Sequence, residues 1–147
     1  MLAFQKAVKA TPDISHCYQP GLRALGSHSS KIQPADTRCC EGSVDLDACL
    51  QTRYPDDNRW DYVLSYKKKA YFVEVHPAQT SEVETVLKKL NWLKNWLAAH
   101  APLVEKQKAV NPYYWIATGK VNILKTSPQH RKVAQAGLMP VSLLKLV

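Results

Sequence analysis

The sequence predicts one α/β domain with a mixed (α+β) sheet: a three-strand meander, a long helix, a further strand, a short helix and a final strand. Two short runs rich in aromatic and β-branched residues, 60–66 and 70–76, flank a polar triplet and predict a β-hairpin. Apolar residues at helical spacing follow between 83 and 97. The strand-like run 113–118 comes after this helix, which favours a parallel partner in the same sheet.

Length and composition suit a single domain over residues 1–147. A chain of 147 residues can bury a substantial core but is short for two domains. No window is long and apolar enough to span a membrane, and the first residues lack the apolar stretch of a secretory signal. We therefore expect a cytoplasmic protein that does not enter a membrane.

Charge is unevenly distributed along this basic chain, whose net charge is +8. Ten of the twelve acidic residues lie between Asp36 and Glu84, whereas residues 106–147 contain seven Lys and Arg and no acid. An acid-rich centre with a basic tail suits a polyanion bound by basic groups while a metal ion is held at carboxylates. The alternative is a basic protein whose charges are simply solvated.

The four cysteines are Cys17, Cys39, Cys40 and Cys49, and their spacing contains no Cys-x-x-Cys pair. Adjacent Cys39 and Cys40 cannot easily bridge to each other, so we expect reduced thiols rather than a disulfide framework. An alternative is a zinc site built from His16, Cys17, Cys39 and Cys40, although its spacing fits no common pattern.

The N-terminal segment carries weak patterns. Phe4 and Val8 predict a helical turn or two, and Asp13 is the expected N-cap of a short helix that runs through Tyr18. The segment 26–38 reads as loop and irregular structure.

Residues 43–50 partly alternate between apolar and polar side chains, which predicts a half-exposed strand with Asp45 and Asp47 on its outward face. Turn residues at 54–58 then lead into the hairpin. Three consecutive strands in a meander are the expected result.

The hairpin register decides where two acidic residues lie. If Lys67 and Lys68 form the turn, Asp61 lies directly opposite Glu74; a three-residue turn moves Asp61 opposite Val75 and leaves Glu74 as a diagonal neighbour. Facing carboxylates repel, so they cost stability unless a cation sits between them.

The long helix is predicted to open with a capping box formed by Ser81 and Glu84 and to end near Pro102. Trp92 and Trp96 widen its apolar stripe and are expected to belong to the core.

Beyond the fourth strand, Ser127 followed by Pro128 predicts the N-cap and first residue of a short helix that Gly137 ends. The segment 121–124 fits either a short strand or loop, and 139–147 predicts a final strand.

This order of elements, with Asp61 starting one strand and Glu74-Val75-His76 ending the next, resembles the core of the PD-(D/E)XK nuclease superfamily, which includes restriction endonucleases and Holliday-junction resolvases. The resemblance covers residues 43–118. It implies a restriction-endonuclease-like core and Mg²⁺-dependent cleavage of nucleic-acid phosphodiesters.

The resemblance also implies residue roles. Asp61 and Glu74, with the Val75 carbonyl, would ligate Mg²⁺, which activates a water and stabilises charge on the phosphodiester. The family lysine falls at His76, which can act as a base but holds charge less reliably near pH 7. Gln79 would orient a water or a phosphate. The implied catalytic residues are thus Asp61, Glu74, His76 and Gln79.

A second departure from the family pattern concerns the acid that many members add from their first helix. Here only Asp13 is available there, and Asp45 or Asp47 could substitute, with Asp45 preferred as the third metal ligand. The basic residues assigned to nucleic-acid contacts are Lys67, Lys68, Arg131 and Lys132. The alternative for the lysine turn is a solvated hairpin tip.

Two further functions compete with a nuclease. One is a catalytically degenerate member of the fold that binds nucleic acid or a protein without cleavage, because the strand lysine and the helix acid are missing. The other is a small interaction module that uses the cysteines and histidines for zinc. In either, Asp61 could simply cap a turn and Glu74 could lie on an exposed sheet face.

Overall fold

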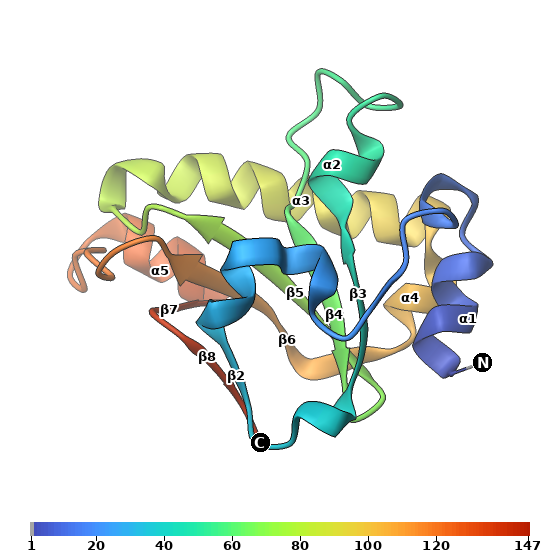
Figure 1. Ribbon diagram of the computed structural model, residues 1–147. Helices are drawn as coiled ribbons and strands as arrows, with labels where there is room; N and C mark the ends of the chain where they lie inside the picture. The colour runs from blue at the N-terminus through green and yellow to red at the C-terminus, as the bar shows by residue number, and fades with distance from the viewer. Residues whose placement is uncertain (1) are drawn as a thin grey trace.

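The computed structural model describes residues 2–147 as an α+β fold, shown in Figure 1. The main sheet contains β1 (Gln19–Pro20), β3 (Cys40–Asp45), β4 (Tyr62–Tyr66), β5 (Lys69–His76), β6 (Lys108–Ala117) and β7 (Leu138–Val141), and β2 (Ile32–Pro34) and β8 (Leu144–Leu146) form a second, smaller sheet. The α-helices are α1 (Ala3–Lys9), α2 (Leu46–Leu50), α3 (Val83–His100), α4 (Pro102–Glu105) and α5 (Pro128–Gln135). Short 3-10 helices are η1 (Pro12–Ile14), η2 (Arg23–Lys31), η3 (Thr37–Cys39) and η4 (Thr80–Glu82).

The main sheet is mixed, with the strand order β1-β3-β4-β5-β6-β7. Strands β3, β4 and β5 are antiparallel neighbours, which confirms the predicted meander. After α3 crosses the sheet, β6 pairs in parallel with β5 and β7 pairs in parallel with β6. The carboxyl ends of β5 and β6 therefore lie at the same edge of the sheet.

The hairpin between β4 and β5 has the two-residue turn that fixes its register. Tyr66 pairs with Lys69 and Tyr62 with Val73, so Lys67 and Lys68 form the turn, which selects the first of the two alternatives left open by the sequence. Both lysines have positive φ, 48° and 66°. A turn with two such residues has the backbone twist that matches the twist of the flanking strands, although lysine is an uncommon residue there.

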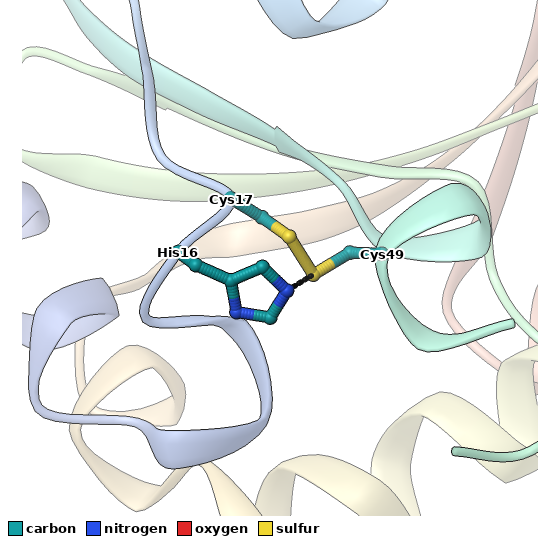
Figure 2. A group of neighbouring side chains, drawn as sticks. All are labelled: His16, Cys17 and Cys49. Atoms are coloured by element: carbon teal, nitrogen blue, oxygen red, sulfur yellow. Dashed lines mark hydrogen bonds between the residues drawn. A yellow bond between two sulfur atoms is a disulfide. The ribbon is translucent and has the colours of Figure 1, made fainter. Parts of the chain in front are cut away.

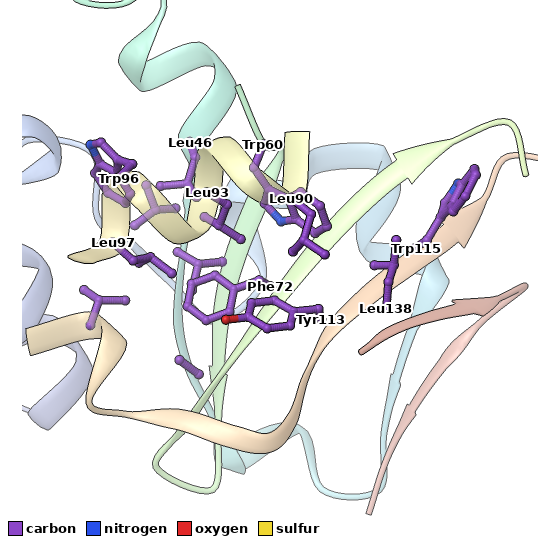
Figure 3. Packing of buried hydrophobic residues seen from close by; sticks show 14 of the residues in the cluster. Leu46, Trp60, Phe72, Leu90, Leu93, Trp96, Leu97, Tyr113, Trp115 and Leu138 are labelled. Atoms are coloured by element: carbon purple, nitrogen blue, oxygen red, sulfur yellow. The ribbon is translucent and has the colours of Figure 1, made fainter. Parts of the chain in front are cut away.

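Two hydrophobic layers cover the two faces of the sheet. On the helical face, Phe72 and Trp115 pack in one cluster with α3 residues such as Leu90 and Leu93 (Figure 3). On the other face, the alternate strand residues pack against η2, β2 and β8; this cluster includes Tyr62, Leu64, Val73, Ile116, Leu144 and Leu146. Period-two alternation thus divides each strand between two cores.

Helix α1 confirms the first predicted helix. The segment that follows it differs from the prediction. Asp13 lies inside η1, after the N-cap Thr11, so its predicted capping role is wrong. Its buried carboxylate instead accepts hydrogen bonds from the Tyr54 hydroxyl (2.6 Å) and Trp96 Nε1 (3.0 Å) and pairs with Arg53 (3.2 Å). Burial raises the pKa of Asp13, but these partners outweigh it and lower the pKa overall.

The predicted strand over 43–50 is correct only as far as Asp45. There the Asp45 carboxylate accepts a hydrogen bond from the Ala48 N–H (2.9 Å) and caps α2, which begins at Leu46. Aspartate is a preferred N-cap because its side chain satisfies one of the unpaired amides of the first turn. The alternating polarity of this segment is compatible with a continuous strand or with a strand followed by a helix. The Asp45 cap favours the helix from Leu46 onward.

The predicted capping box of α3 is also wrong. Glu82 occupies the position before the first turn, and the Glu84 carboxylate pairs with Lys132 Nζ at 2.8 Å. The helix ends at His100, close to the predicted stop at Pro102.

The C-terminal third follows the prediction in part. The Ser127 hydroxyl oxygen accepts a hydrogen bond from the His130 N–H (3.1 Å), and Gly137 follows α5 with φ 73°, as predicted. The segment 121–124 is loop. The stretch predicted as one final strand is split between β7 and β8, and β8 pairs with β2 in a region predicted to be irregular.

Cys17 and Cys49 form a disulfide, so the expectation of reduced thiols is wrong for this pair. Cys39 and Cys40 remain thiols in the described part of the chain. The alternative of a zinc site built from His16, Cys17, Cys39 and Cys40 is not formed, because Cys17 is bonded to Cys49. Within residues 2–147, no helix combines the length and apolarity needed to cross a membrane.

Candidate functional site

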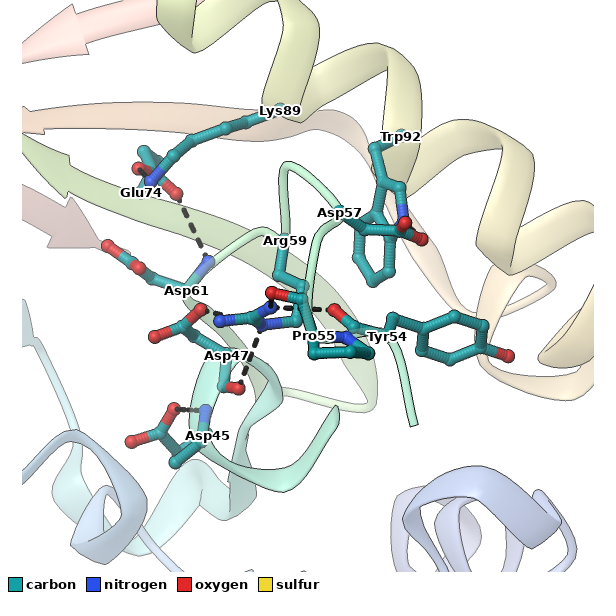
Figure 4. Close-up of polar contacts among 11 residues, drawn as sticks. Asp45, Asp47, Tyr54, Pro55, Asp57, Arg59, Asp61, Glu74, Lys89 and Trp92 are labelled. Carbon is teal, nitrogen blue, oxygen red and sulfur yellow. Dashed lines mark hydrogen bonds and ion pairs between the residues drawn. The ribbon is translucent and has the colours of Figure 1, made fainter. Parts of the chain in front are cut away.

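The candidate site lies at the start of β4 and the end of β5, beside the first half of α3 (Figure 4). Asp61 directly precedes β4, and Glu74 is near the end of β5. The register that pairs Tyr62 with Val73 puts Asp61 opposite Glu74. The two residues continue the rows of Val63 and Phe72, which face α3.

The backbone of Asp61 is fixed from both sides. Its carbonyl accepts hydrogen bonds from the first amides of α2, at Leu46 (2.8 Å) and Asp47 (3.3 Å). The preceding loop is held by Arg59, whose guanidinium donates to the Tyr54 carbonyl (2.7 Å) and pairs with the Asp47 carboxylate (3.0 Å). The site is therefore built on backbone that α2 and Arg59 position.

Two reciprocal hydrogen bonds join the acidic residues to the opposite strand. Glu74 Oε1 accepts the Asp61 N–H (3.1 Å), and Asp61 Oδ2 accepts the Val75 N–H (2.9 Å). The Glu74 side chain is 0 % exposed, and its second oxygen accepts a hydrogen bond from Lys89 Nζ at 2.6 Å. One lysine from α3 thus faces two carboxylates from the hairpin.

Burial perturbs all three charges. Burial, followed by the neighbouring Asp61 charge, raises the pKa of Glu74 to about 8, although Lys89 opposes the shift. Burial also raises the pKa of Asp61. Burial alone would lower the pKa of Lys89, but the charge and hydrogen bond of Glu74, together with the charges of Asp61 and Asp47, outweigh it and raise that pKa. The site therefore favours an added positive charge.

His76 extends this cluster. Its Nδ1 lies 3.9 Å from Glu74 Oε2, and its Nε2 lies 3.3 Å from Glu82 Oε2, an ion pair when the imidazole is protonated. The His76 carbonyl accepts a hydrogen bond from Trp115 Nε1 (3.0 Å), which anchors the end of β5 to β6. His76 thus lies between two carboxylates with a fixed backbone.

Gln79 is an exposed residue in the segment after β5 and is paired with Asn122 through an isolated β-bridge. The 118–127 loop is held against this segment, since the Asn122 N–H donates to the Ala78 carbonyl (2.7 Å) and the Leu124 N–H to the Thr80 hydroxyl (3.0 Å).

Asp45 does not join Asp61 and Glu74. It pairs with Tyr62, whose row faces the opposite side of the sheet, and its carboxylate caps α2. Asp47 lies between Asp45 and Asp61 in Figure 4, with its carboxylate held by Arg59. Of the two acids considered as the third metal ligand, Asp47 therefore lies nearer to Asp61 than Asp45 does.

The basic residues predicted to contact nucleic acid are not gathered at this site. Lys67 and Lys68 form the hairpin tip, about 20 Å from Glu74 at about 3.3 Å per residue along β5. Lys67 Nζ donates to the Val147 carbonyl (2.6 Å). Arg131 and Lys132 are exposed on α5, where Lys132 pairs with Glu84.

Lys89 is the site residue that the sequence analysis missed. Its signal is a charge in an otherwise apolar row of the long helix, which reads Val86, Lys89, Leu93 and Trp96 at spacings of three, four and three residues. A lysine in such a row is directed at the core and needs a buried partner. Here that partner is Glu74.

A divalent cation fits the chemistry of these donors. Mg²⁺ is commonly bound by one or two carboxylates and keeps several waters, so Asp61 and Glu74 suffice as protein ligands. Burial is the main cause of the raised pKa of each carboxyl, so a bound cation would stabilise the ionised forms. Searches with protein-family models, characterised proteins and solved structures gave no match to this chain.

Proposed function

We propose that this protein is a metal-dependent hydrolase of nucleic-acid phosphodiesters, with a restriction-endonuclease-like core. The observation that carries the proposal is the pair of a half-buried Asp61 and a fully buried Glu74 at the end of a hairpin, with Lys89 Nζ at 2.6 Å from Glu74. Paired carboxylates that face each other in apolar strands cost stability, and a site for a cation and a phosphate accounts for that cost.

Each residue has a distinct role in this proposal. Asp61 and Glu74 would hold Mg²⁺; a bound ion supplies an activated water and stabilises the charge that develops on the phosphate. Lys89 opposes the rise in the pKa of Glu74 and provides the durable cation that the family places at the position of His76. His76, beside Glu74 and Glu82, would accept the proton of the attacking water.

The 118–127 loop supports binding of a polyanion near these residues. It carries the exposed residues Lys120 and Lys125 and is hydrogen-bonded to the segment that follows β5. We assign phosphate-backbone contacts to these two lysines, in addition to Arg131 and Lys132 on α5. The hairpin-tip lysines lie too far along β5 to contact the same phosphates.

The test is cleavage of supercoiled plasmid, single-stranded DNA and RNA with Mg²⁺ or Mn²⁺ at pH 8. Glu74→Gln should abolish cleavage because it removes the anionic ligand and keeps the shape of the side chain. Glu84→Gln is the matched control, since Glu84 is an exposed residue of α3 paired with Lys132. Equal activity in Glu74→Gln and the wild type would refute the assignment.

A degenerate, non-cleaving form of the same fold is the second candidate, and one observation favours it. Asp61 and Glu74 already accept backbone hydrogen bonds, and Lys89 already neutralises one charge. This candidate predicts salt-sensitive nucleic-acid binding without cleavage. Binding that weakens in a Lys120→Ala/Lys125→Ala variant, together with no cleavage under any metal condition, would establish it.

A further inference from the structure

A second cluster of metal-ligating side chains lies away from the carboxylate pair, at the Cys17–Cys49 disulfide (Figure 2). Cys17 follows η1, and Cys49 is on α2. His16 Nε2 lies 3.9 Å from Cys49 Sγ, and one ligand atom from each of the three residues lies within 4.8 Å of the others. Two sulfurs and an imidazole nitrogen therefore share one small volume.

These three residues line a cavity of about 600 Å³, together with Arg23, Asp45 and other residues. His16 is exposed, and the two cysteines are half-buried. A solute can thus reach the sulfurs and the imidazole. The cavity also has room for water beside them.

We propose that reduction of the Cys17–Cys49 disulfide creates a zinc site formed by both thiolates and His16 Nε2, with water in the fourth position. Thiolate and imidazole are the ligands that Zn²⁺ prefers, at about 2.3 Å and 2.0 Å. A tetrahedron with those bond lengths has edges of about 3.6 Å between nitrogen and sulfur and about 3.8 Å between sulfurs. The separation of 3.9 Å between His16 Nε2 and Cys49 Sγ is already close to the first value.

The chemistry couples redox state to metal binding. A dithiol reductant transfers two electrons and two protons to the disulfide, which gives two thiols, and the dithiol closes to its own disulfide. Zinc binding then displaces the two thiol protons to solvent. Oxidation by a disulfide reverses the exchange and releases the ion, so thiol and disulfide forms are alternative states of one site.

Both states tie the same segments together. In the disulfide form a covalent bond joins the chain after η1 to α2, and in the zinc form the ion bridges the same two cysteines. Since α2 also carries Asp47 and donates to the Asp61 carbonyl, both forms hold that helix in place. The two forms therefore join the same two segments, while the bonded sulfurs separate to about 3.8 Å in the zinc form.

The test compares the full chain in two redox states. Protein reduced with excess dithiol and desalted without oxygen should bind one Co²⁺ or Zn²⁺ per chain, with thiolate-to-cobalt charge-transfer absorption. The oxidised protein should show no such absorption. This comparison uses only the wild type, so it does not depend on whether any variant folds.

Variants assign the ligands. Cys17→Ser/Cys49→Ser should abolish binding, His16→Ala should weaken it at least tenfold, and Cys39→Ser/Cys40→Ser removes the same number of thiols and should leave it unchanged. The proposal is overturned if oxidised protein gives the same charge-transfer absorption, if reduced protein binds neither ion, or if the Cys39/Cys40 variant loses binding while the Cys17/Cys49 variant keeps it.

Discussion

Replacing Glu74 by glutamine should remove a pH dependence of stability that this buried carboxyl creates. In the folded protein, burial and the charge of Asp61 raise the pKa of Glu74 from 4.5 to about 8. The folded state therefore holds a proton that the unfolded chain releases above pH 4.5. Stability from Glu74 is fully present below that pH and is lost as the pH rises through about 8.

The size of this change in the free energy of unfolding follows from the interval between the unfolded-state and folded-state pKa values of Glu74. Between the two pKa values the free energy of unfolding falls by about 1.4 kcal/mol per pH unit for each proton held only by the folded state. From pH 5 to pH 8 the wild type should lose about 4 kcal/mol relative to Glu74→Gln. The Glu74 side chain is 0 % exposed, so screening by solvent reduces this value little.

The assay is urea denaturation of wild type, Glu74→Gln and Glu84→Gln at pH 5, 6, 7 and 8. Glu84 is more than half exposed and paired with Lys132, so its variant should follow the wild-type pH curve. If wild type and Glu74→Gln give parallel curves over this range, Glu74 does not carry a raised pKa and the reasoning fails.

Three other substitutions test separate parts of the structure, each by urea denaturation. Lys89→Met should lower the free energy of unfolding by about 3 kcal/mol because it leaves a buried carboxyl without its cation; no loss would show that the pair is not formed. Lys67→Asn/Lys68→Gly should raise it by about 1 kcal/mol, since both positions have positive φ; a loss would contradict the two-residue turn. Gly42→Ala should cost about 2 kcal/mol because the added methyl would overlap the Tyr18 ring, and a neutral effect would refute that packing.

Local patterns predicted the part of the site that the hairpin defines. Three lysines between runs of β-branched and aromatic residues locate the hairpin but leave a two-residue and a three-residue turn open, and the length of the turn sets the register. Once Lys67 and Lys68 are the turn, Asp61 must lie opposite Glu74, which the structure confirms. The long amphipathic helix and the Ser127 cap are local features of the same kind.

Features that depend on distant partners were missed or misassigned. The local sequence around Asp13 and Asp45 is compatible with a helix cap or an exposed acid. Only the fold shows that the Asp13 carboxylate accepts hydrogen bonds from Trp96 and Tyr54, and that Asp45 caps α2. The pairing of β2 with β8 joins residues more than 100 positions apart, which no local pattern specifies. The Cys17–Cys49 bond likewise follows from the path of the chain, because spacing alone does not choose partners.

Lys89 could be predicted from the local pattern only in part. Its position in an apolar helical row could have indicated a buried partner, but the sequence does not say which acid would meet it. The arrangement of the sheet determines the partner, because α3 crosses the face of the sheet from which the Glu74 side chain projects. His76 therefore does not have to be the only cation near the carboxylates.

The central claim is that Asp61 and Glu74 form a site for a divalent cation, and Mn²⁺ titration followed by electron paramagnetic resonance tests it most directly. We expect one Mn²⁺ per chain at pH 8, an affinity about 50-fold lower at pH 6 because a proton competes for Glu74, and loss of binding in Glu74→Gln but not in Glu84→Gln. Absence of saturable binding at pH 8, or equal binding by the wild type and Glu74→Gln, would contradict the account.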